Sequence, residues 1–335
     1  MLKFPESYIV LDQNHIERGV YSLRPIRYED RHSIRKWRNE QIFHLRQSKE
    51  LSTEEQDVYF QHSVLPLFKE EHPNQLLFSF YKEGQFVAYG GLVHINWIDL
   101  NAEVSFVMDT SLERDYFVEL WVNFLALLKV FAFKHLGFRK IFTYAFDLRP
   151  RLYVALEKAG FLEEARLQDH CYFDSSYYDV LYHSFFNPRY GISLRQADDK
   201  DCELLFTWAN DRTVRLNSNS PEPIEWENHK AWFHKCLSSV NTKIFIFQSI
   251  HNQLLGQLRL DYVDGKWLIG YSMDFKYRGL GLGKEIVKLA LSEIPNGVFQ
   301  AQVKKQNISS SKVFQSLGFT LEYSTGDSYF FKYQA

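Results

Sequence analysis

The chain has 335 residues, enough for about two domains, and its 45% hydrophobic and 24% charged residues are typical of a globular protein. A formal net charge of −2 argues against nucleic acid as the main partner, and no apolar run reaches the ~18 residues of a membrane span. The amino terminus lacks a secretory-signal pattern, and the three cysteines suggest neither a disulfide framework nor a metal site. We therefore expect a cytoplasmic protein without a bound metal.

The first half predicts a strand ending at Ser22-Leu23-Arg24 and then a helix that begins near Asp30 and carries Trp37. Antiparallel strands are expected over 75–81, 86–96 and 103–108, followed by a helix over 117–136. A further strand, a helix and closing strands complete this half.

The second half repeats this order. Ser193-Leu194-Arg195, Asp201 and Trp208 stand at one constant offset from their counterparts in the first half. The expected strands are 243–249, 254–261 and 266–273, and the expected helix is 283–293. A duplicated domain is indicated, with each copy in the α/β (α+β) class: a mixed, mostly antiparallel sheet flanked by helices. Pro188 and Gly191 mark a linker, which gives domains over 1–187 and 190–335.

A glycine-rich turn lies between the last of these strands and the helix after it. Its residues are Arg278, Gly279, Leu280, Gly281, Leu282, Gly283 and Lys284. Glycines let the backbone approach a ligand closely, and the N–H groups of a first helical turn attract anions, so a phosphorylated cofactor is expected here. The spacing fits neither a Walker loop nor a dinucleotide fingerprint.

The pattern R-x-x-G-x-G from Arg278 to Gly283 resembles the acetyl-CoA pyrophosphate loop of the GNAT acetyltransferase superfamily. Downstream, Asn307, Ser310, Phe314 and Gly318-Phe319 resemble that family's closing motif. The resemblance implies two GNAT modules in tandem and direct transfer of acetyl from acetyl-CoA to a primary amine. It also implies cofactor contacts from residues 278–284, from Asn307 and Phe314, and from Tyr271 and Met273 on the preceding strand.

The first half lacks the loop. Residues 111–117 contain no glycine, and Glu113 and Asp115 would repel a pyrophosphate. Arg149 stands where the closing motif has asparagine, so a degenerate module without acetyl-CoA is expected. Glu103 occupies the position of a general base in many family members, but without the loop we interpret it as a solvated strand residue.

Two positions in the second half depart from the family pattern. Phe314 replaces the usual tyrosine acid, and Leu268 stands where a glutamate base is common. The remaining candidates for proton transfer are Ser310, Asp261, Tyr271 and His229. Each also has an ordinary structural interpretation, as a helix-bonding serine, a turn aspartate or a packed side chain.

The segment 208–233 resembles the substrate side of GNAT modules that acetylate nucleotide-linked amino sugars in nonulosonic-acid pathways. Under this resemblance Arg215 would meet a nucleotide phosphate, Asn217 a sugar hydroxyl and Trp232 a sugar or base face. The first half resembles ribosomal-protein N-terminal acetyltransferases instead, which leaves a peptide acceptor open. A non-catalytic acetyl-CoA sensor is a third possibility, and either a monomer or a homodimer is expected.

Overall fold

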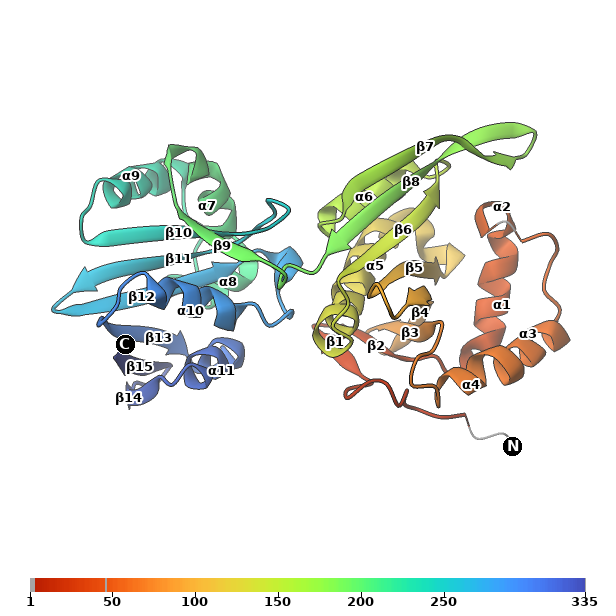
Figure 1. The fold of residues 1–335 in the computed structure, drawn as a ribbon, viewed down its shortest axis with the longest axis horizontal. Helices are drawn as coiled ribbons and strands as arrows, with labels where there is room; N and C mark the ends of the chain where they lie inside the picture. Colours follow the sequence, from red (N-terminus) through yellow and green to blue (C-terminus); the bar gives the residue numbers. More distant parts are fainter. Residues whose placement is uncertain (1–3, 46, 335) are drawn as a thin grey trace. The chain divides into compact units, whose positions relative to one another are not determined.

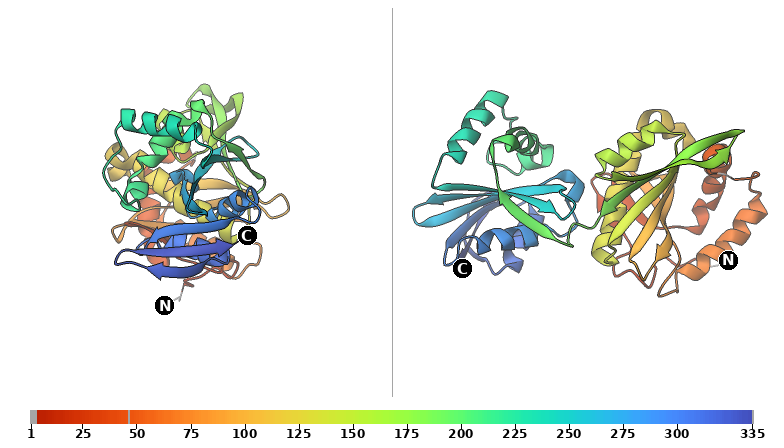
Figure 2. Two further views of the ribbon diagram at one scale, coloured as in Figure 1. Left: turned by 90° about the vertical axis from the view of Figure 1, so that its left-hand side faces the viewer. Right: turned by 45° about the horizontal axis from the view of Figure 1, so that its top comes forward.

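The computed structural model describes residues 4–45 and 47–334. The chain divides into two compact units, Met1–Asn187 and Pro188–Ala335, which we call the first and second modules (Figure 1). Each module is a sheet with helices on both faces (Figure 2).

The first module is built on an eight-stranded sheet in the order β1-β2-β3-β4-β5-β6-β8-β7. Its strands are β1 (Ile16–Arg18), β2 (Tyr21–Pro25), β3 (Leu76–Lys82), β4 (Gln85–Asn96), β5 (Asn101–Met108), β6 (Lys140–Phe146), β7 (Leu162–Phe173) and β8 (Ser176–Phe186). Only β5 and β6 pair in parallel, and the other neighbours are antiparallel.

The helices of the first module are short except for one. They are α1 (Arg31–Glu40), α2 (Ile42–Leu45), α3 (Thr53–Tyr59), α4 (Leu65–Leu67), α5 (Glu113–Lys129) and α6 (Pro150–Lys158). By length and composition the stretch Thr110–His135, which contains α5, could cross a membrane. Its side chains Leu120, Phe124 and Phe131 are fully buried, so it is the core helix of this module.

The second module has a seven-stranded sheet in the order β14-β15-β13-β12-β11-β10-β9. Its strands are β9 (Ile192–Gln196), β10 (Thr242–Ser249), β11 (Leu254–Val263), β12 (Lys266–Met273), β13 (Val298–Lys304), β14 (Thr320–Ser324) and β15 (Ser328–Gln334). The helices are α7 (Cys202–Ala209), α8 (Arg212–Leu216), α9 (Trp226–Leu237), α10 (Gly283–Ser292) and α11 (Ile308–Ser316). The expected fold class, two mixed and mostly antiparallel sheets flanked by helices, is confirmed.

The one parallel strand pair of each sheet diverges after a short contact. In the first module, β5 and β6 pair from Asn101↔Lys140 to Glu103↔Phe142 only. In the second module, β12 and β13 pair from Trp267↔Phe299 to Ile269↔Ala301 only. Beyond these points the facing backbone edges of the strands leave the sheet ladder, so they are available to a ligand.

The repeated aspartates act differently from the helix caps that the sequence indicates. Neither Asp30 nor Asp201 caps its helix through its side chain. Asp201 is buried and accepts hydrogen bonds from Nη1 and Nη2 of Arg195 at 2.7 and 2.8 Å. Asp30 is equally buried and accepts from Arg27, Ser79 and Tyr81. These residues therefore tie the first helices to the sheets.

We expect Asp201→Asn to destabilise the second module by about 2 kcal/mol, because charge-assisted hydrogen bonds to Arg195 are lost. Burial opposes ionisation of Asp201, but the bonds from Arg195 and from the Asp198 backbone outweigh it and lower the pKa of the carboxyl. A lowered folded-state pKa stabilises the fold above pH ~4, and that stabilisation is lost as the pH falls through the folded-state value. Urea unfolding at pH 7 measures the effect, with the exposed Asp199→Asn as control.

Candidate functional site

The glycine-rich loop of the second module connects β12 to α10. Gly279 and Gly281 have φ angles of +84° and +77°, a conformation that favours glycine. Both glycines are exposed, whereas the intervening Leu280 and Leu282 are buried. The leucines therefore anchor the loop and leave its glycine backbone open to a ligand just before Gly283, where α10 begins.

Two arginines lie against this loop. Arg278 donates from Nε to the carbonyl of Met273 at 3.0 Å, and its Nη2 pairs with Asp211 at 2.8 Å. Arg278 therefore holds the loop between β12 and α8. A Cβ atom placed on Gly281 would lie 2.5 Å from Nη2 of Arg189, so a second guanidinium borders the exposed glycine. The sequence motif gives no sign of Arg189, which lies far from the loop along the chain.

Helix α8 spans the diverging ends of β12 and β13. Its capping residue Asp211 contacts Arg278, which follows β12. At the other end of α8, the carbonyl of Leu216 accepts bonds from Lys304 and Gln306 at 3.3 and 3.2 Å, where β13 ends. Arg215 and Asn217, two of the expected acceptor residues, therefore lie near the ends of β12 and β13, where these strands no longer pair.

Tyr271 and Ser310 meet in the second module. The Tyr271 hydroxyl lies 3.1 Å from Oγ of Ser310, and its ring packs edge-on against Phe314. A Cβ atom on Gly283 would be 3.4 Å from the same hydroxyl, which therefore sits between the first turns of α10 and α11. Burial raises the pKa of Tyr271, so the hydroxyl stays protonated at neutral pH. Asn307 caps α11 by accepting from the Ser310 backbone.

Asp261 and Trp232 are brought together by Arg259. Nε of Arg259 lies 2.7 Å from Asp261, and its guanidinium lies 5.2 Å from the ring centroid of Trp232. Nearby in sequence, His229 is only 1% exposed, and its Nε2 lies 3.0 Å from the Cys202 carbonyl. This position favours packing between α7 and α9. Arg259 is a polar group of this cluster that the sequence motifs did not indicate.

Residues 270–273 of β12 have one edge without a strand partner, because the pairing with β13 stops at Ile269. A Cβ atom on Gly270, which would point out of the sheet face, would meet nothing within 4 Å. Met273, at the end of this edge, accepts the bond from Arg278. The backbone of residues 270–273 can therefore face a ligand.

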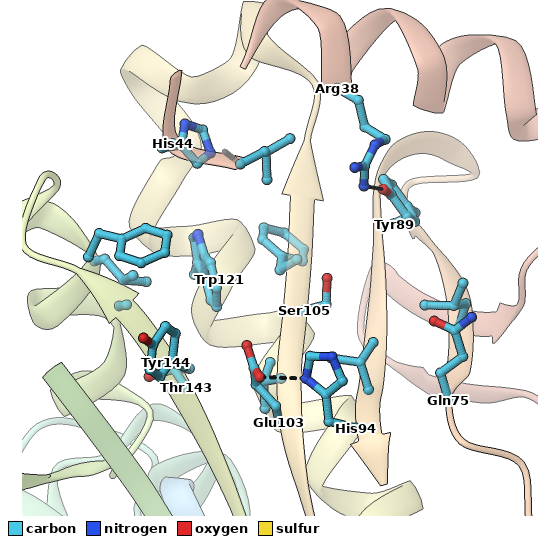
Figure 3. Close-up of a pocket in the computed structure, with 18 of the residues that line it drawn as sticks. Arg38, His44, Gln75, Tyr89, His94, Glu103, Ser105, Trp121, Thr143 and Tyr144 are labelled. Atoms are coloured by element: carbon cyan, nitrogen blue, oxygen red, sulfur yellow. Dashed lines mark hydrogen bonds and ion pairs between the residues drawn. The ribbon is translucent and has the colours of Figure 1, made fainter. Parts of the chain in front are cut away.

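The first module contains a cavity of about 680 Å³ where β5 and β6 diverge. Figure 3 shows polar side chains from α1, α2, β4, β5 and β6 around it. Glu103 lines this cavity, is 22% exposed and lies 2.8 Å from Nδ1 of His94. Glu103 therefore keeps contact with solvent, as a strand residue would, and also forms part of the wall of this cavity.

Two buried side chains of this cavity have no hydrogen-bond partner within residues 4–45 and 47–334. They are His44, through both ring nitrogens, and Thr143, through Oγ1. Burial, with a smaller contribution from Arg149, lowers the pKa of His44 to about 3, so the ring is neutral at pH 7. A buried polar group without a partner costs about 1–3 kcal/mol, so a ligand that supplied these hydrogen bonds would be stabilised here.

The first module has no counterpart of the glycine loop. A 3₁₀ turn over Thr110–Leu112 leads directly into α5, whose first turn carries Glu113 and Asp115. Arg151 donates from Nη2 to the carbonyls of Glu113 and Arg114 at 3.1 and 3.0 Å. Acidic side chains therefore stand at the start of the helix that corresponds to α10.

Both modules match family models described as acetyltransferase (GNAT) domain, over residues 23–182 and 192–320. The chain therefore belongs to the GNAT acetyltransferase family and carries two such domains in tandem.

One curated relative is an uncharacterized protein of Methanocaldococcus jannaschii, 30% identical over 137 residues. The match covers 38% of this chain and only 28% of that protein. Among solved structures, a domain from Methanocaldococcus jannaschii is 25% identical to this chain. The match covers 43% of this chain and 98% of that chain, with a TM-score of 0.39. Spermidine N-acetyltransferase from Vibrio cholerae, in complex with CoA and spermine, is 17% identical to this chain. The match covers 51% of this chain and 97% of that chain, with a TM-score of 0.44.

Proposed function

We propose that the second module binds acetyl-CoA and transfers its acetyl group to a primary amine. The observation that carries this proposal is the loop itself: exposed Gly279 and Gly281 alternate with buried leucines directly before α10. Such a loop holds a pyrophosphate through backbone N–H groups. Arg189 adds a positive charge beside Gly281, and Asn307 and Phe314 lie on the helix that would flank the pantetheine arm.

Acetyl transfer needs a group that polarises the thioester, a group that donates a proton and a group that accepts one. A backbone N–H from the free edge of residues 270–273 would polarise the thioester carbonyl. The neutral amine attacks, a C–N bond forms and the C–S bond breaks. The Tyr271–Ser310 pair would give a proton to the departing thiolate. Asp261 would accept the proton released by the amine, directly or through water.

For the acceptor we propose a nucleotide-linked amino sugar. Arg215 lies where β12 and β13 separate, and its buried Nε has no hydrogen-bond partner among the residues that the structure describes, so it could bond a phosphate oxygen. Trp232 is 36% exposed and offers a ring face to a sugar. Asn217 follows α8 and offers an amide to a hydroxyl.

The test is release of CoA from acetyl-CoA in the presence of UDP-4-amino-sugars, peptides with free amino termini, polyamines and aminoglycosides. Turnover with the amino sugars alone is expected. Turnover with peptides alone would replace this acceptor by a peptide. Binding of acetyl-CoA without turnover on any amine would contradict catalysis and favour a sensor.

Arg215→Gln should raise the KM for the amino-sugar nucleotide about 10-fold, because one charge-assisted bond to phosphate is lost. The KM for acetyl-CoA should stay the same. Arg212→Gln on the same helix is the matched control. An unchanged acceptor KM in the Arg215 variant would remove this residue from the acceptor site.

A further inference from the structure

The cavity of the first module is built from opposite charges at two ends. Glu103 carries a carboxylate at the point where β5 and β6 separate. Arg38 of α1 donates from Nη1 to the Tyr89 hydroxyl at 3.0 Å and pairs with no carboxylate among the residues that the structure describes. Tyr59 also lines this end of the cavity, so one guanidinium and two phenol groups gather there.

These two ends lie on the same side of the sheet. Tyr89 pairs with Val107, and Glu103 stands four residues before Val107 on β5. Side chains two or four residues apart share a face, and four residues of a strand span roughly 14 Å. An amino acid, with its amine and carboxylate on one carbon, is too short to reach both ends. An extended tripeptide spans about 10 Å, and the long side chains of arginine and glutamate close the remaining gap.

The middle of the cavity has polar groups of its own. His44 is 8% exposed and Thr143 is 3% exposed, and the polar side-chain atoms of both have no partner in the described part of the chain. A neutral imidazole offers one donor and one acceptor, and a hydroxyl offers both, which matches the alternating N–H and C=O groups of a peptide backbone. Acidic residues at the start of α5 disfavour a pyrophosphate in this module.

We propose that the cavity of the first module binds a short peptide, with its amino terminus at Glu103 and its carboxylate at Arg38, without acetyl-CoA. The Arg38 guanidinium with its phenol neighbours suits a carboxylate, and Glu103 with His94 beside it suits an ammonium group. A second guanidinium, that of Arg149, also lines the cavity and acts on His44. All residues of this site belong to the first module, whereas those of the proposed acetyl-transfer site belong to the second. The first module would thus contribute ligand recognition rather than chemistry.

The experiment is equilibrium dialysis of the intact protein against random-sequence tripeptides, with mass spectrometry as readout. Three forms are compared: free peptides, N-acetylated peptides and peptides with a C-terminal amide. Free peptides should be retained about 10-fold better than either capped form, because each cap removes one charge-assisted contact. Equal retention of free and capped peptides by the unmodified protein, or no retention of any peptide, would overturn the proposal.

Two variants separate the two ends. Glu103→Gln should lose the preference for a free amino terminus and keep the preference for a free carboxylate. Arg38→Gln should show the reverse, and Lys36→Gln, an exposed change on the same helix, should alter neither. A variant that loses both preferences together would be read as unfolded and checked by its thermal transition. Gly281→Glu should retain tripeptide binding, so failure of this proposal is distinguishable from failure of the acetyl-transfer proposal.

Discussion

Replacing Gly281 by glutamate is expected to abolish acetyl-CoA binding, with an affinity loss of about 100-fold or more. A left-handed φ of +77° costs a residue with a side chain about 1–2 kcal/mol. The new carboxylate would pair with Arg189, whose Nη2 lies 2.5 Å from the position of the Cβ atom, and would so compete with the pyrophosphate for this guanidinium. Its negative charge would stand where the pyrophosphate is proposed to bind, and like charges repel. Together these effects exceed the ~2.7 kcal/mol that a 100-fold change requires.

The matched control is Gly265→Glu in the turn between β11 and β12. Gly265 has a φ of +79°, similar to that of Gly281, and a Cβ atom there meets nothing within 4 Å. This variant carries the same backbone strain and the same added charge, but away from the loop. Calorimetric titration should find its affinity for acetyl-CoA unchanged. An unchanged affinity in the Gly281 variant would refute the loop assignment.

Tyr271→Phe is expected to lower kcat about 100-fold, because a positioned general acid contributes factors of that size. Its KM for acetyl-CoA should stay within about twofold, since the ring that packs on Phe314 is retained. Burial raises the pKa of Tyr271, so the acid stays protonated through neutral pH, and its loss should leave no new pH dependence near pH 7.

Ser310→Ala tests the partner of this tyrosine and should give a smaller loss of kcat, because the hydroxyl of Tyr271 remains. Tyr262→Phe, on the exposed end of β11, is the control and should keep full activity. If kcat of the Tyr271 variant equals that of the unmodified enzyme, the thiolate takes its proton from solvent.

The sequence predicted those features of the fold that depend on residues close together along the chain. Gly279, Gly281 and Gly283 lie within one turn, so their spacing alone indicated the loop between β12 and α10. The strands were found from apolar runs, and their ends agree with the structure to within a few residues. The helix expected from Phe117 begins earlier, at Glu113, because acidic residues are favourable in a first helical turn.

Contacts between distant residues could not be found in this way. Arg189 reaches Gly281, and Arg259 joins Asp261 to Trp232, only because the chain folds. Glu103 is partly solvated, as a single strand suggests, but the divergence of β6 from β5 also places it on the wall of a cavity. The cavity around it draws Arg38 and Thr143 from elements far apart in the sequence. No local sequence pattern predicts that these side chains line one cavity.

The most direct test of this account is the stoichiometry of acetyl-CoA binding, measured by calorimetric titration of the intact chain. One site per chain is expected, and that site should disappear in the Gly281→Glu variant. Two sites per chain, or one site that survives this substitution, would show that the first module binds acetyl-CoA and would contradict the assignment of the cofactor to the second.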